Sequence, residues 1–163
     1  MKNLLLLLLS LSFFGNSFAA NSPIVGEWHI QHIYNGKVKM YDRNDPKCII
    51  RFGLKTLKTA KPNYTSADSL RAAQAYSNAQ TFIGKAYMKF SADGKFIGYQ
   101  PEADNPDKPL DNGTYTYNAQ TGVVSIQTGI KTGPEHISIK GKTMFVDIED
   151  QGEHIHIEYL KFK

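Results

Sequence analysis

The sequence predicts an all-β protein, an antiparallel up-and-down β-barrel of eight to ten strands with one helix capping an opening. Short runs of alternating apolar and polar residues follow one another closely, separated by turn sequences such as Asn35-Gly36 and Ala92-Asp93-Gly94. One alanine-rich stretch, residues 65–80, carries a helix signature instead. Many short strands joined by tight turns are typical of barrels and sandwiches.

The N-terminus has the features of a secretory signal peptide over residues 1–19. Lys2 precedes an apolar run from Leu4 to Leu11, and Ser17-Phe18-Ala19 supplies small residues before the expected cleavage point. The apolar run is too short to span a membrane, so an integral membrane protein is not expected. Because no cysteine lies near the cleavage point, a bacterial lipid anchor is not expected either. We therefore expect one domain over residues 20–163, either periplasmic or secreted.

Composition limits the chemistry of the domain. Cys48 is the sole cysteine, so it cannot form an intramolecular disulfide, and its apolar flanks favour a buried thiol. The formal net charge of +4 is mild. Much of it comes from residues 34–65, which contain eight Lys and Arg but only two acidic residues, Asp42 and Asp45. Such a run usually forms a solvated face, with binding of phosphate or an anionic surface as the weaker alternative. Export argues against a nucleic-acid partner.

The strands can be placed in order along the chain. Residues 24–34 form the first, and 37–42 and 47–54 are expected to follow as half-buried strands. The last of these has apolar residues at alternate positions, which would lie on one face of a strand: Cys48, Ile50, Phe52 and Leu54. The later strands read KAYMKF, KFIGYQ, GTYTYN, GVVSIQT, EHISIK, TMFVDIED and EHIHIEYLKFK, with Phe90 expected opposite Phe96.

The single predicted helix begins after Thr65. Thr65 and Asp68 have capping-box spacing, and no Gly or Pro interrupts residues 65–80. The face that includes Ala72, Tyr76 and Ile83 is composed mainly of small residues. We therefore expect this helix to lie shallowly across one opening of the barrel.

Residues 147–158, DIEDQGEHIHIE, predict the register of the final hairpin. A two-residue turn at Gln151-Gly152 places three apolar pairs on one face, which a slip of one residue would scatter. These pairs are Ile148 with Ile155, Val146 with Ile157, and Met144 with Tyr159.

The opposite face of the same hairpin carries histidines and carboxylates. Glu149 then faces His154, and Asp147 faces His156. These four side chains are weak candidates for a zinc or copper site, but such pairs more often make a sheet face soluble. We therefore expect a solvated face and no metal. His29 and His32 have opposite strand parity, so they are not expected to share a face.

The sequence IVGEWHI, with Gly26-x-Trp28, resembles the first-strand signature of lipocalins and related calycin barrels. The later order of FSADGKF, GTYTYN and the final hairpins is similar to that of bacterial lipocalin-like domains. The resemblance implies that Trp28 closes the barrel floor beneath a basic residue of the last strand. Lys161 stands where the family usually has arginine, and Gly26, Trp28 and Lys161 are therefore the expected floor.

The resemblance also implies that a small hydrophobic ligand binds inside the barrel, without a cofactor. The interior candidates are Ile30, Met88, Phe90, Phe96, Tyr115, Tyr117, Val146 and Ile157. If these side chains fill the interior, the alternative is an envelope or secreted interaction or inhibitor module. A surface metal binder is the third hypothesis. An enzyme is not expected, because the chain has no nucleophile-elbow, phosphate-loop or zinc-protease motif.

Overall fold

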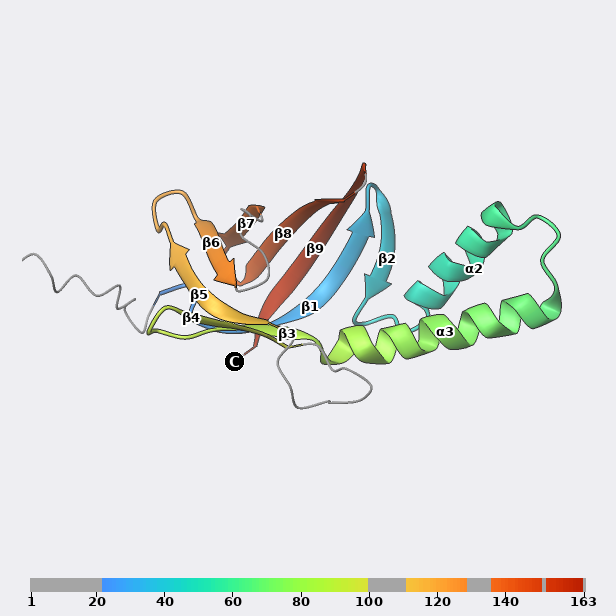
Figure 1. Cartoon of the computed structure of the whole chain (residues 1–163), viewed down its shortest axis with the longest axis horizontal. Helices are drawn as coiled ribbons and strands as arrows, with labels where there is room; N and C mark the ends of the chain where they lie inside the picture. Colours follow the sequence, from blue (N-terminus) through green and yellow to red (C-terminus); the bar gives the residue numbers. More distant parts are fainter. Residues whose placement is uncertain (1–21, 100–110, 129–135, 151, 163) are drawn as a thin grey trace, which may run out of the picture.

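The computed structural model describes residues 22–99, 111–128, 136–150 and 152–162, so the expected signal peptide lies outside the described residues. The strands form one antiparallel sheet of nine in the order β2-β1-β3-β4-β5-β6-β7-β8-β9, and β1 also pairs with β9. This pairing closes eight strands into a barrel and leaves β2 as an additional strand (Figure 1). The predicted all-β antiparallel barrel is confirmed.

The strands follow the expected order along the chain. Phe90 pairs with Phe96 as predicted, and Gly94 in the turn between them has a φ of 81°. The strands are β1 Gly26–Asn35, β2 Val38–Asp42, β3 Tyr87–Phe90, β4 Lys95–Tyr99, β5 Asp111–Tyr117, β6 Val123–Thr128, β7 His136–Lys140, β8 Thr143–Asp150 and β9 Glu153–Phe162.

The final hairpin has the predicted register. Ile148 pairs with Ile155, and the pairing continues through Val146 with Ile157 to Met144 with Tyr159. Met144, Val146 and Tyr159 are buried in the core, which is the physical reason for this register, since a slip of one residue would expose them.

A β-bulge in β1 changes which side chains face the interior. Opposite β9, Ile30 pairs with Tyr159 and His32 pairs with Glu158, so Gln31 is the extra residue. Ile33 pairs with Ile157 and packs against the core, as Ile30 does. The prediction that His29 and His32 lie on different faces is therefore wrong, because the bulge turns both histidines toward the outside of the barrel.

Two helices, not one, join β2 to β3: α2 over Cys48–Ala60 and α3 over Ser66–Lys85. The prediction of a strand over residues 47–54 is wrong. Its apolar residues fit a helical spacing as well as an alternation, because Cys48 and Phe52 share one helix face and Ile49 and Gly53 share another. The capping box of α3 is confirmed, with the Asp68 N–H donating to Thr65 Oγ1 at 3.2 Å and the Thr65 N–H donating to Asp68 Oδ2 at 2.8 Å.

Helices α2 and α3 form a hairpin, here called the helical arm, that projects to one side of the barrel (Figure 1). α3 packs chiefly against α2 and touches β1 only lightly, and it has no buried residue. The arm therefore does not cover an opening as the sequence suggested. Lys61 Nζ lies 2.9 Å from Asp68 Oδ2 across the bend of the arm, and this contact, with the Thr65 hydrogen bonds, lowers the pKa of Asp68 below its usual range.

The packing of α2 on α3 depends on a close approach at Gly53. A Cβ placed on Gly53 would lie 2.0 Å from the Tyr76 ring, so any larger residue would require the two helices or the ring to shift. Tyr76 belongs to the helix face identified from the sequence, but its contact with Gly53 was not anticipated. No helix in the described ranges is long and apolar enough to cross a membrane.

We predict that Gly53→Ala loosens the helical arm by about 1–3 kcal/mol, because the added methyl group overpacks the contact with Tyr76. Amide hydrogen exchange in α2 and α3 measures this directly. Gly84→Ala is the matched control in α3, since its Cβ would lie 3.6 Å from the Tyr41 hydroxyl, an ordinary contact. Equal protection of the arm in the wild type and Gly53→Ala would contradict the close packing.

Candidate functional site

One end of the barrel is closed by the chain preceding β1. Trp28 is 0% exposed, and its Nε1–H donates a hydrogen bond to the Ile24 carbonyl at 2.8 Å. Lys161 Nζ lies 5.5 Å from the centre of the Trp28 ring and donates to the Pro23 carbonyl at 2.9 Å. Burial lowers the pKa of Lys161. The tryptophan and the lysine, which come from opposite ends of the domain, thus meet at the floor of the barrel.

Gly26 suits two features of this floor. Its φ of 139° lies in a region that side chains rarely adopt, and a Cβ at this position would lie 2.7 Å from Lys161 Cε. The Gly-x-Trp sequence therefore combines a backbone that leaves space for the lysine with an aromatic ring against which the lysine can pack.

The side chains facing the interior form two groups with different exposure. Five of the eight ligand candidates are buried in the core: Ile30, Phe90, Phe96, Tyr115 and Val146. The Tyr115 hydroxyl already donates to the Ser91 carbonyl at 2.8 Å, and its ring meets Phe90 edge-on with centres 4.9 Å apart. These contacts make Tyr115 part of the sealed core.

The second group is partly exposed although it packs against the same core. It contains the other three candidates, Met88, Tyr117 and Ile157, and residues that were not among the predicted ligand candidates. Among the latter are Ile33, Ile126 and Ile148. Alternation along the strands is enough to place Ile126 and Ile148 inside the barrel. It would place Ile33 outside, because the bulge shifts the alternation by one residue.

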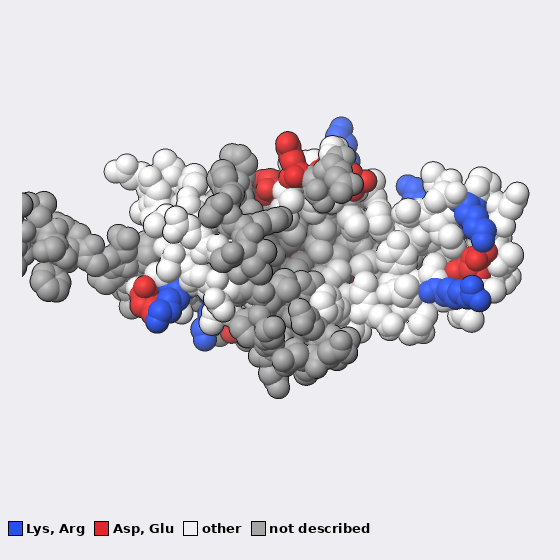
Figure 2. Space-filling model, viewed as in Figure 1, with Lys and Arg blue, Asp and Glu red and all other residues white. Residues whose placement is uncertain are grey.

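Whereas Met88 pairs directly with Trp28, three partly exposed residues of the second group, Ile33, Ile148 and Ile157, lie toward the end of the barrel opposite Trp28. The β1–β2 and β8–β9 turns meet there, with Asn35 paired to Ile155 and the Gly36 N–H donating to the His154 carbonyl at 2.9 Å. Acidic side chains gather near this end in Figure 2, and Asn35 Nδ2 donates to Glu153 Oε2 at 2.8 Å. The barrel therefore has a tightly packed floor and a less buried upper end with a polar rim.

The histidines and carboxylates of the final hairpin lie on its outer face. Asp147 accepts both contacts, with Oδ1 2.7 Å from His156 Nδ1 and 3.4 Å from His154 Nε2. Glu149 and His154 are paired in the strand register, but the His154 ring lies next to Asp147. His154 is 53% exposed, so this part of the surface is well solvated.

The same surface continues across β9, β1 and β2 as alternating bases and acids. His156 Nε2 lies 3.7 Å from Glu158 Oε1, and Glu158 Oε2 lies 2.6 Å from His32 Nδ1. His32 Nε2 lies 3.6 Å from Asp42 Oδ2, which Lys39 Nζ contacts at 3.0 Å. Each imidazole is thus next to a carboxylate, and no group of three or more His, Cys, Asp or Glu within the described ranges is arranged to hold a metal ion.

We predict that Trp28→Ala lowers the free energy of unfolding by about 3–5 kcal/mol, because it removes a large, fully buried side chain from the floor. Chemical denaturation measures the loss. Trp28→Phe, which keeps a ring beneath Lys161, should cost less. An unchanged unfolding midpoint in Trp28→Ala would mean that the ring does not support the barrel.

We predict that replacing His154 and His156 together with glutamine costs about 1 kcal/mol or less, because partly exposed ion pairs contribute little. Elemental analysis of the wild type should find no stoichiometric zinc or copper. A stoichiometric metal that disappears in the double variant would refute this prediction and establish the metal hypothesis.

Comparison with known proteins supports the fold alone. No protein-family model and no curated protein matches this chain. Among solved structures, the chain is similar to a DUF4847 family protein from Bacteroides vulgatus ATCC 8482, with a TM-score of 0.50 and 14% identity over 88% of this chain and 97% of the other. At this identity the similarity extends to the barrel architecture and does not carry a function.

Proposed function

We propose that this chain is an exported, lipocalin-like binding protein that holds a small hydrophobic molecule in its barrel. The observation that carries the proposal is the difference in burial along the interior. Trp28, Phe90 and Met144 are sealed, whereas Ile33, Ile148 and Ile157 at the other end are partly exposed although they pack on the same core. An apolar molecule at the upper end would cover these side chains and gain the free energy of their removal from water.

The geometry supports entry from the end that carries the β1–β2 and β8–β9 turns. The opposite end is occupied by Trp28, Ile24 and the Lys161 side chain. The buried tyrosine Tyr115 already has a hydrogen-bond acceptor, so binding would depend mainly on apolar contact. We expect the ligand to lie above Trp28, against Ile33 and Ile157.

Export and a non-catalytic role are parts of the same proposal. Lys2 and the apolar run from Leu4 to Leu11 support export. The Cys48 side chain is buried, and its burial raises the pKa of the thiol, so the cysteine is a poor nucleophile. The Gly26-x-Trp28 pair and the closed barrel support the lipocalin-like assignment.

Native mass spectrometry of the protein purified from its own host tests the proposal. We expect a fraction of the protein to carry one small apolar molecule, identifiable after denaturation and extraction. A protein that retains nothing, and that does not bind an added fluorescent fatty-acid analogue, would contradict ligand binding.

We predict that Ile157→Gln weakens binding of the fluorescent fatty-acid analogue by about tenfold, because a buried amide without a partner costs about 1–3 kcal/mol. Leu160→Gln is the matched control, since Leu160 lies on the same strand but is 46% exposed on the outside. A fluorescence titration of both variants, each checked for an intact fold by circular dichroism, measures the difference. Equal weakening in the two variants would argue against a site in the barrel.

A second candidate, an interaction module, is favoured by an aromatic row on the outer face. Phe162, His29, Tyr87 and Tyr99 follow one another across four neighbouring strands, with successive ring centres 4.9, 5.6 and 4.9 Å apart. Phe162 is 61% exposed. Exposed aromatic residues of this kind are enriched at protein interfaces. Pull-down from the host with wild type and Phe162→Ser distinguishes this function from ligand binding.

A further inference from the structure

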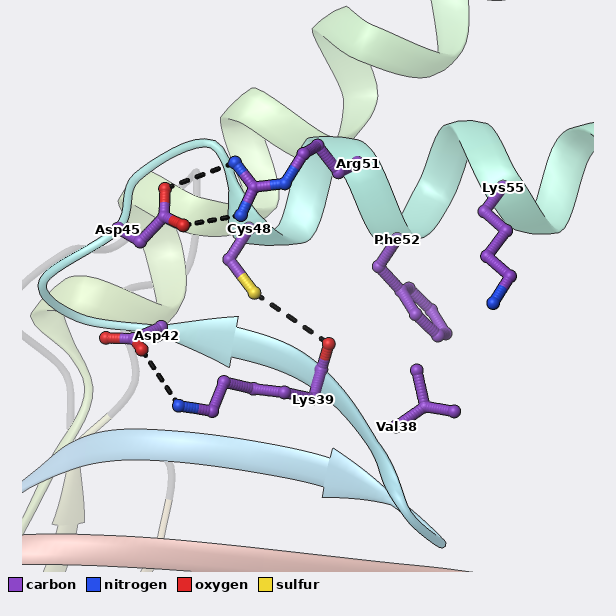
Figure 3. Close-up of a pocket in the computed structure, with 8 residues that line it drawn as sticks. All are labelled: Val38, Lys39, Asp42, Asp45, Cys48, Arg51, Phe52 and Lys55. Atoms are coloured by element: carbon purple, nitrogen blue, oxygen red, sulfur yellow. Dashed lines mark hydrogen bonds and ion pairs between the residues drawn. The ribbon is translucent and has the colours of Figure 1, made fainter.

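A pocket separate from the barrel interior lies between β2 and α2. Its volume is about 450 Å³, within the range of sites that bind small molecules. One wall is formed by β2 and the other by the first half of α2 (Figure 3). The pocket therefore lies between the sheet and the helical arm.

The helix contributes one continuous face to this pocket. Cys48, Arg51, Phe52 and Lys55 are spaced by three, one and three residues, which places them along one side of α2. The approach to α3 uses a different side of the same helix, at Gly53. α2 is thus packed on one side and faces an open pocket on another.

The charges around the pocket do not cancel. Lys39 Nζ lies 3.0 Å from Asp42 Oδ2, and the Arg51 guanidinium forms a fork with both oxygens of Asp45. These contacts lower the pKa of both carboxyl groups, chiefly through the hydrogen bonds from Lys39 and Arg51, so both aspartates are ionised at neutral pH. Lys55 makes no ion pair with any residue in the described ranges, which leaves one cation in excess.

Apolar surface lies beside this cation. Figure 3 shows Phe52 and Lys55 pointing from α2 toward β2, with Val38 pointing from the strand toward them. Cys48 adds to the apolar lining, because its buried thiol makes only a weak contact with the Lys39 carbonyl, at 3.8 Å. The pocket therefore offers one free positive charge next to an aromatic ring and aliphatic carbons.

We propose that this pocket binds a small organic monoanion with an apolar body, such as a medium-chain or aryl carboxylate. The carboxylate pairs with Lys55, and the apolar body lies between Phe52 and Val38. Because the two walls belong to different parts of the protein, the bound molecule holds the helical arm against β2. This site is independent of the ligand proposed for the barrel.

The test is a titration of the ¹⁵N-labelled protein with octanoate, followed by amide chemical shifts. We expect saturable shifts in residues 38–42 and 48–55, and a weaker response to uncharged 1-octanol. Lys55→Gln should weaken octanoate binding by roughly fivefold, the upper range for a solvent-exposed ion pair. Lys58→Gln removes the same charge from the same helix but not from the pocket lining, so it should bind as the wild type does.

Several outcomes would overturn the proposal. Shifts confined to barrel residues such as Met88 and Ile157 would mean that octanoate enters only the barrel. Equal binding of octanol and octanoate, or equal weakening by Lys55→Gln and Lys58→Gln, would show that Lys55 does not recognise the anion. Competition by inorganic phosphate at equal concentration would indicate a simple anion site, and no shift at millimolar octanoate would exclude the pocket.

Discussion

The pairing of β1 with β9 is the interaction on which the rest of the structure depends. It joins the two ends of the domain and converts an open sheet into a closed barrel. The same pairing brings Lys161 over Trp28, so closure of the sheet and closure of the barrel floor occur together. A closed barrel also leaves few exposed strand edges, which lowers the risk of pairing with other chains.

The bulge in β1 determines which of its side chains face the barrel interior and which face solvent. Without Gln31 as an extra residue, Ile33 would face solvent and His32 would face the core. The bulge keeps Ile33 with Ile157 inside and brings His32 between Glu158 and Asp42 outside. One irregular residue therefore maintains the apolar upper interior and also joins β2 to the barrel through polar contacts.

The two proposed sites share a structural origin in the way β1 changes partners. β3 pairs with the first part of β1, and β2 pairs with the last part. The chain between them has to leave the sheet, and it does so as the helical arm (Figure 1). The closed sheet forms the barrel interior, whereas the packing of the helical arm beside β2 forms the pocket at Lys55. Their chemistry differs accordingly, since one is lined by apolar side chains and the other carries an excess cation.

The sequence alone determined the features that depend on local chemistry or on regular alternation. The capping box at Thr65 and the register of the final hairpin follow from short-range patterns. Tertiary structure decided the conformation of residues 47–54, because short apolar runs fit a strand and a helix equally well until a packing partner is known. It also decided the bulge at Gln31 and the contact of Gly53 with Tyr76. These features arise from the fit between distant segments, and no local pattern of residues encodes that fit.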